Sequence, residues 1–187
     1  MGQDEDGLDV YQRRYLEHQA RKAEVLRDLM ERCHSDRIFD QAEVTDETLD
    51  RVLAAAKTAP SSCNRQAVQI QAIRQRDDRA RLGGLLVGGV GWVHRAPVVL
   101  LFHVDPEAYK APGEIDFMPY LDIAFAADRV LLAAESEGLK HCFINPSIRK
   151  PDLEFFQKSF NIELFAGAVA LGWPGPPYWV GDTSSLK

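Results

Sequence analysis

Hydrophobic and polar positions follow a helical period in the first part of this 187-residue chain. Residues 9–32 place apolar side chains at helical spacing among charged ones, which predicts a helix with one buried stripe. A second helix is expected after Thr45, whose side chain suits the N-cap, while Asp46 and Glu47 suit the positive end of the helix dipole. Pro60 comes just past the end of this helix, because proline cannot continue its hydrogen-bond ladder.

Four later segments have the pattern of strands. Residues 68–74 alternate between apolar and polar positions, as in a strand with one buried face. Residues 97–104 are continuously apolar and rich in β-branched side chains, which indicates a central strand covered on both faces. Two more strands are expected at 140–145 and 164–173, with a short helix at about 149–158 between them.

A longer helix is expected over residues 120–138, which are apolar almost all round. Such a helix is buried in a core or lies in a subunit interface, and Gly138 is its expected stop. Helices interleaved with a sheet of about four strands predict an α+β, or mixed α/β layered, class. We expect a single domain over residues 1–187, with residues 1–8 disordered.

Composition and charge exclude several classes of protein. Lysine and arginine number 22 against 28 acids, for a net charge of −6, so no basic surface for nucleic acid is expected. The longest apolar stretch, 96–102, is far shorter than the ~18 residues of a membrane helix, and the acidic N-terminus is no secretory signal. Cys33, Cys63 and Cys142 are odd in number and lack C-x-x-C spacing, so neither disulfides nor a metal site is expected. A cytoplasmic location follows as the default.

Three segments could carry chemistry, and each has a simpler explanation. Residues 32–40, "RCHSDRIFD", place several cationic side chains at the end of the first helix. The simpler explanation is a solvated helix end, where cations suit the negative end of the helix dipole. Residues 58–70, "TAPSSCNRQAVQI", form a polar elbow between helix and strand, as an ordinary turn also could. Residues 106–119 are long for a connection in a compact domain, and loops of this length often serve as lids.

The order of these segments resembles the flavin-dependent nitroreductase family. The matching residues of the first two segments are Ser35, Arg37, Phe39, Ala59, Pro60, Ser61, Ser62, Asn64, Arg65 and Gln66. Later landmarks are the strand at 96–105, Asp122 at the start of the apolar helix, and the segments 137–145 and 168–174. The resemblance covers roughly residues 25–175 and implies a nitroreductase-like fold, with a mainly antiparallel central sheet flanked by helices and a long buried helix.

The resemblance also implies a homodimer that binds FMN at the subunit interface. One subunit would supply the 33–37 segment and the other would supply the elbow, and the backbone at 144–146 would face flavin N5. The residues assigned to FMN in this way are Cys33, His34, Ser35, Arg37, Pro60, Ser61, Ser62, Asn64, Ile144, Asn145 and Pro146. Tyr109, Phe117 and Tyr120 would shape the substrate pocket, although core packing would explain them equally well.

The implied activity is oxidoreduction by a ping-pong mechanism. A reduced nicotinamide, NAD(P)H, would deliver hydride to the flavin, which would pass it to an electron-poor small molecule such as a nitroaromatic or a quinone. Arg37 would lie near flavin N1 and O2, because a fixed cation there stabilises the negative charge of the reduced ring. No catalytic side chain is required.

Two departures from the family pattern keep alternatives open. Cys33 stands where the family usually has a phosphate-binding arginine, and Lys187 is the sole cation after the last strand. A non-catalytic binding protein of the same fold, with weak or no FMN, is therefore one alternative. Ala67 stands where many nitroreductases have proline, which is similar to the cyclodipeptide oxidase branch, so a flavin dehydrogenase of that kind is another. The roles of Cys33 and Cys63 stay open between buried filler and redox chemistry.

Overall fold

The computed structural model describes residues 9–111 and 113–176. The chain divides into two compact units, Met1–Cys33 and His34–Lys187, each of which is described by itself. The expected disorder of residues 1–8 and the expected role of Lys187 fall outside the described residues.

The first unit consists of helix α1 (Val10–Arg32). Asp9 caps it by accepting hydrogen bonds from the amides of Tyr11 and Gln12, and the Gln12 side chain accepts one from the Asp9 amide in return. The helix lies where it was predicted, but the prediction that it has a buried stripe is wrong, because α1 buries no residue. A single helix has no second element within its own unit to cover its apolar side chains, and the large exposed ones are Val10, Tyr11, Tyr15, Leu16, Val25, Leu26 and Met30.

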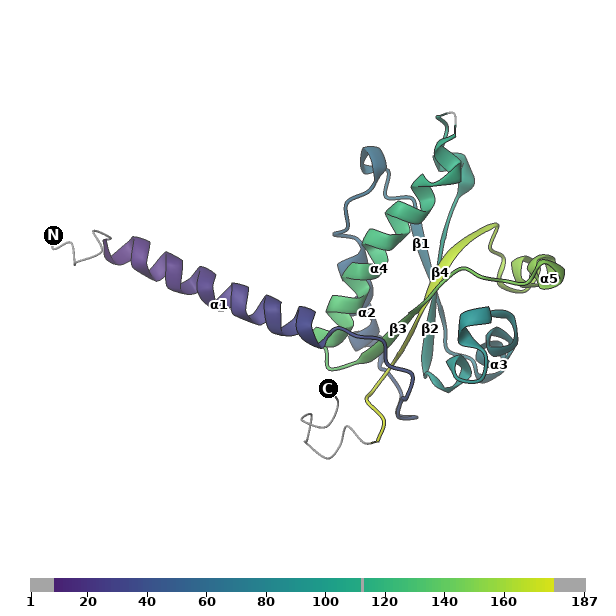
Figure 1. Ribbon diagram of the computed structural model, residues 1–187, viewed down its shortest axis with the longest axis horizontal. Helices are drawn as coiled ribbons and strands as arrows, with labels where there is room; N and C mark the ends of the chain where they lie inside the picture. The colour runs from purple at the N-terminus through teal and green to yellow at the C-terminus, as the bar shows by residue number, and fades with distance from the viewer. Residues whose placement is uncertain (1–8, 112, 177–187) are drawn as a thin grey trace. The chain divides into compact units, whose positions relative to one another are not determined.

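The second unit is built on a four-stranded antiparallel sheet (Figure 1). Its strands are β1 (Val68–Ile73), β2 (Val98–Val104), β3 (Lys140–Ile144) and β4 (Leu164–Gly172), in the order β1-β2-β4-β3. The central strands β2 and β4 are buried along nearly their whole length, as the continuously apolar pattern predicted for β2.

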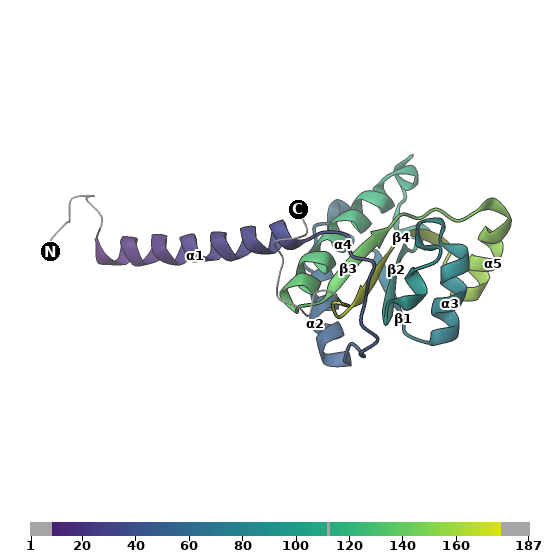
Figure 2. The same ribbon diagram turned by 60° about the horizontal axis from the view of Figure 1, so that its bottom comes forward.

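Two helices cover each face of the sheet (Figure 2). The helices α2 (Asp46–Ala56) and α4 (Met118–Ser136) share one core cluster with Leu100 and Phe102 of β2. The helices α3 (Arg76–Leu85) and α5 (Lys150–Phe160) pack on the other face, where Val99 and Leu101 belong to a second cluster. Alternate residues of β2 therefore enter opposite cores, and the expected α+β class with an antiparallel central sheet is confirmed.

Local signals placed most helix ends correctly. The Thr45 side chain accepts a hydrogen bond from the Thr48 amide at 3.2 Å, as an N-cap should. Gly138 has φ = 77° directly after α4, which is the left-handed stop expected there. The sequence reasoning missed α3, and α4 is not buried all round, because Leu121 and Phe125 are about half exposed. Within the described residues, no helix has the length and apolarity needed to cross a membrane.

Candidate functional site

The elbow after α2 has an unusual backbone. Helix α2 ends at Ala56, and the chain then forms a 3₁₀ turn at Ser62–Asn64. Cys63, Asn64 and Gln66 have φ values of 52°, 53° and 54°, in the left-handed region that disfavours residues other than glycine. Each such residue costs on the order of 1 kcal/mol or more, so the surrounding structure must hold the elbow in place.

Two hydrogen bonds to backbone amides hold the elbow. The amide of Ser62 donates to Oδ1 of Asp122 at 2.8 Å, and the amide of Gln66 donates to Oγ of Ser61 at 2.9 Å. Asp122 belongs to the first turns of α4 and is only 2% exposed. The sequence reasoning used Asp122 only as a landmark, whereas the structure makes it the acceptor that fixes the elbow to α4.

The long connection at 106–117 is tied to the same elbow. Arg65 forms an ion pair with Glu114, whose carboxylate also accepts a hydrogen bond from the Ser62 hydroxyl at 3.3 Å. The hydrogen bond from Arg65 lowers the pKa of Glu114. Tyr109 is buried, and its hydroxyl donates to Oδ2 of Asp122, so that burial first and this bond second raise its pKa. The connection is therefore cross-linked to the elbow.

A cavity of ≈ 590 Å³ opens beside the elbow. It is lined mainly by small and apolar side chains of α2, the elbow, β1 and α4, and its charged lining residues among those described are Asp50, Lys57 and Asp122. The three residues expected in a substrate pocket do not line it. Tyr109 is buried, while Phe117 and Tyr120 are 54% and 45% exposed. Their role in substrate binding stays a prediction.

The second segment with predicted binding residues lies along β3. Ser35 forms a parallel bridge with His141, and the amide of Asp36 donates to the His141 carbonyl at 2.8 Å. This pairing leaves the side chains of His34, Ser35 and Arg37 exposed. The segment thus presents an imidazole, a hydroxyl and a guanidinium beside an edge strand.

Cys142 of β3 lies beneath this segment. Burial raises the pKa of its thiol, while a hydrogen bond with Ser35 and the charge of Arg37 act in the opposite direction. At the end of β3 Ile144 is buried, and just beyond the strand Asn145 is exposed and Pro146 is partly exposed. The 34–37 segment and the end of β3 therefore belong to one side of the unit.

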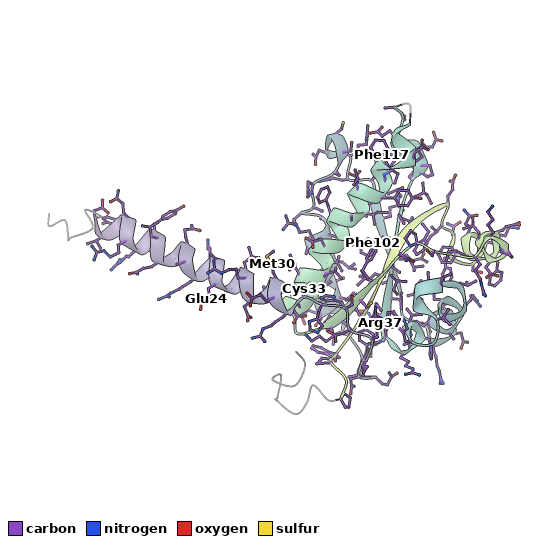
Figure 3. All side chains as sticks on the ribbon, viewed as in Figure 1. Glu24, Met30, Cys33, Arg37, Phe102 and Phe117 are labelled. Carbon is purple, nitrogen blue, oxygen red and sulfur yellow. The ribbon has the colours of Figure 1, made fainter. Side chains whose placement is uncertain are left out.

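The two predicted halves of the site lie at opposite edges of the sheet. The 34–37 segment pairs with edge strand β3, and the elbow leads into edge strand β1. Three strand spacings of about 4.8 Å separate these edges by roughly 14 Å. Figure 3 shows Arg37 at one end of the unit and Phe117, the N-cap residue of α4, at the other. Asp122, which binds the elbow, belongs to the first turns of the same helix. One chain does not bring the two halves together.

Cys33 belongs to the first unit, where it follows the last turn of α1. Its amide donates to the Leu29 carbonyl at 3.0 Å. Its assignment to FMN stays a prediction, as do those of the other predicted binding residues.

The exposed donors nevertheless fit a flavin mononucleotide chemically. Ser35, His34 and Arg37 are hydrogen-bond donors suited to phosphate oxygens or to an electron-rich ring edge. At the elbow, Asn64 is exposed, whereas the Ser62 hydroxyl already bonds with Arg65 and Glu114. For metals, residues 9–111 and 113–176 contain no group of three or more His, Cys, Asp or Glu side chains arranged to hold an ion.

Comparison with known proteins supports the same family. Residues 30–91 match the model of the nitroreductase family. The FMN reductase [NAD(P)H] of Bacillus subtilis (strain 168) is 30% identical over 116 residues, which are 62% of this chain and 46% of that protein. The match therefore spans less than half the length of that relative.

Two solved structures share the fold. NfrA2 of B. megaterium superposes with a TM-score of 0.69 at 25% identity, over 80% of this chain and 66% of that one. A protein from Desulfovibrio desulfuricans, solved in complex with FMN, gives a TM-score of 0.67 at 23% identity, over 80% of this chain and 86% of that one. The fold expected from the sequence is thus confirmed, and the match to the nitroreductase family model covers residues 30–91.

Proposed function

Because this chain has the nitroreductase fold and matches the nitroreductase family over residues 30–91, we propose that it is an FMN-dependent oxidoreductase. The observation that carries the proposal is the 34–37 segment, which aligns Ser35 and Arg37 along β3 and leaves both side chains exposed. The name of the B. subtilis relative, an FMN reductase that uses NAD(P)H, supports the same cofactor and the same electron donor.

In this proposal the bound FMN supplies hydride transfer at its N5 atom. Arg37 would hold a fixed positive charge against the pyrimidine edge, where it would favour the reduced state. The His34 and Ser35 side chains would donate hydrogen bonds to the phosphate, and the backbone at 144–146 would orient the reacting edge of the ring. In this mechanism the protein binds and orients FMN, and it needs no side chain that acts as acid, base or nucleophile.

The site requires a second copy of the chain. The elbow and the 34–37 segment lie at opposite edges of one sheet, so the elbow of one subunit would meet the 34–37 segment of its partner. An exposed apolar face on α4, formed by Phe117, Leu121 and Phe125, supports such an interface. Aligned apolar side chains of this size on a helix are typical of surfaces that pack against a partner.

The proposed substrates are NAD(P)H as donor and an electron-poor acceptor, of the nitroaromatic or quinone type. The location proposed for this reaction is the cytoplasm, from the composition of the chain. Since Cys33 replaces an arginine of the family pattern, phosphate binding would depend more on His34 and on neutral donors, and FMN affinity would be lower than with a bidentate arginine.

A visible absorption spectrum of the purified full-length chain tests the proposal. We expect a flavin spectrum after addition of FMN and removal of the excess, with bleaching when NADH or NADPH is added without oxygen. Absence of bound flavin would instead support a non-catalytic protein of the same fold. A bound flavin that is not reduced by NADH or NADPH but is reduced by a cyclic dipeptide would support the cyclodipeptide oxidase alternative.

A further inference from the structure

An aromatic ring, rather than a carboxylate, supports the guanidinium of Arg37. The Cζ atom of Arg37 lies 5.7 Å from the centroid of the Trp92 ring. Among residues 9–111 and 113–176, no carboxylate forms an ion pair with Arg37. The other arginine beside the candidate site, Arg65, is paired with Glu114.

This difference in partner changes what each cation can do. A carboxylate at ion-pair distance opposes the field of an arginine with a full negative charge, so little field is left for a ligand. An aromatic face holds a cation through its quadrupole and leaves the net charge uncompensated. Arg37 is therefore oriented without being neutralised.

The Trp92 ring is itself held from two sides. Its Nε1 donates a hydrogen bond to the Gly88 carbonyl at 3.0 Å. The ring also stacks on Phe39, with centroids 6.5 Å apart and planes inclined by 26°, and Phe39 is buried in the core on the α3 and α5 face. The position of Trp92 is thus fixed both by its own turn and by the core.

The same turn lies against the end of β3. The amide of Val87 donates to the Ser147 carbonyl at 3.0 Å. A Cβ added at Gly88 would lie 3.3 Å from Cγ2 of Ile144 and 3.7 Å from Oδ1 of Asn145, so the turn approaches this segment closely. Residues 87–92 therefore contact Arg37 and also lie against the side chains of Ile144 and Asn145, in the segment assigned to the flavin.

We propose that Trp92 is a positioning residue of the FMN site, which holds the Arg37 guanidinium in place and keeps its charge available to the pyrimidine edge of the flavin. The inference rests on the proposed function. Trp92 lies just outside the residues that match the family model, and nothing in its local sequence indicated a contact with Arg37.

A double-mutant cycle on the full-length chain tests this contact. Trp92→Leu, Arg37→Leu and the double variant are compared with the wild type for FMN affinity, measured by quenching of flavin fluorescence, and for the midpoint potential of the bound flavin. We expect Trp92→Leu to weaken FMN binding about 2- to 5-fold, as the loss of an exposed cation–π contact implies. It should also lower the potential. In the Arg37→Leu background the same change should have little further effect.

Two further variants separate positioning from a loss of folding. Trp92→Phe keeps an aromatic face and should recover part of the affinity and of the potential. Trp173→Leu is the matched control, because Trp173 also donates its Nε1 hydrogen to a backbone carbonyl, that of Glu43 at 3.1 Å, whereas the cation–π contact of Arg37 is with Trp92. It should leave the flavin potential unchanged.

The outcomes distinguish this inference from the proposed function. If the wild type binds FMN but the effects of the two leucine substitutions add fully, or Trp92→Leu changes neither affinity nor potential, Trp92 does not act through Arg37 and the inference is wrong. If the wild-type chain binds no FMN, the proposed function fails, and the inference fails with it.

Discussion

The phenol of Tyr109 donates a hydrogen bond to Oδ2 of Asp122 at 2.8 Å, and both residues are buried, at 6% and 2% exposure. The other carboxylate oxygen of Asp122 accepts the amide hydrogen of Ser62. One side chain therefore joins the long connection, the start of α4 and the elbow. Four predictions follow from this network and from the rest of the unit.

Removal of the Asp122 carboxylate should destabilise the second unit strongly. Asp122→Ala leaves the Ser62 amide and the Tyr109 hydroxyl without their acceptor, and each buried orphan donor costs about 1–3 kcal/mol. We expect the free energy of unfolding to fall by about 2–5 kcal/mol in urea denaturation. Tyr109→Phe breaks one of the two bonds and should cost clearly less. Equal losses in the two variants would contradict the role given to Ser62.

Glu114 should protect the connection at 106–117 from proteolysis. Its carboxylate pairs with Arg65 and accepts a hydrogen bond from the Ala111 amide at 3.2 Å, which is the amide of the Lys110–Ala111 bond. In Glu114→Ala this bond loses its restraint, so we expect trypsin to cleave after Lys110 several-fold faster than in the wild type. Glu107→Ala removes an exposed carboxylate of the same connection and serves as the control. Similar cleavage in both variants would show that the connection is not held by Glu114.

The unfolding free energy should decrease as the pH falls below about 6.5, the ordinary pKa of histidine. Burial lowers the pKa of His141, with the charges of Glu135 and Asp36 opposing the shift. Below pH 6.5 the unfolded chain therefore binds a proton that the folded chain excludes, so stability is present above this pH and is lost below it. The slope from one such group is at most about 1.4 kcal/mol per pH unit.

Urea denaturation from pH 7.5 to 5 checks this prediction. The His141→Gln variant should show a shallower pH dependence than the wild type. His103, whose pKa burial also lowers, should retain its own contribution in that variant. An unchanged slope in His141→Gln would assign the whole effect to other groups.

The exposed face of α4 should be the subunit interface. Phe125 is 51% exposed there, and a charge at this position would have to be buried on association. We expect Phe125→Asp to shift the chain to the monomer mass of 21.0 kDa in light scattering and to weaken FMN binding as well. Phe155→Asp on α5, where the phenylalanine is 55% exposed, should change neither. A monomeric wild type would overturn the dimer.

Local sequence signals account for what was predicted of the fold. The Thr45 cap and the left-handed Gly138 involve groups only a few residues apart, so their patterns can be read directly. Helix α3 was missed because half of its residues are charged, it contains Gly83 and Gly84, and it buries only Leu82 and Leu85. For α1, periodicity identified an apolar stripe but not whether another element covers it.

In the candidate site, too, the local features were predicted and the contacts between distant residues were not. The elbow and the 34–37 segment were recognised because their residues are contiguous. The contacts that hold them join residues far apart in sequence, such as Asp122 with Ser62 and Trp92 with Arg37, and no periodicity or spacing encodes such pairs. Asp122, near the start of an apolar helix, was the one sign in the sequence of such a contact, because a buried carboxylate without a partner would not be tolerated there.

The left-handed backbone at Cys63, Asn64 and Gln66 has a kinetic consequence. The bonds that maintain it come from Ser61 and Asp122 of the same chain, so the elbow is preorganised before any ligand arrives. Its conformational entropy is lost during folding rather than on binding. Ligand capture at this surface should therefore be limited by diffusional encounter and dimer assembly, without a slow loop-ordering phase.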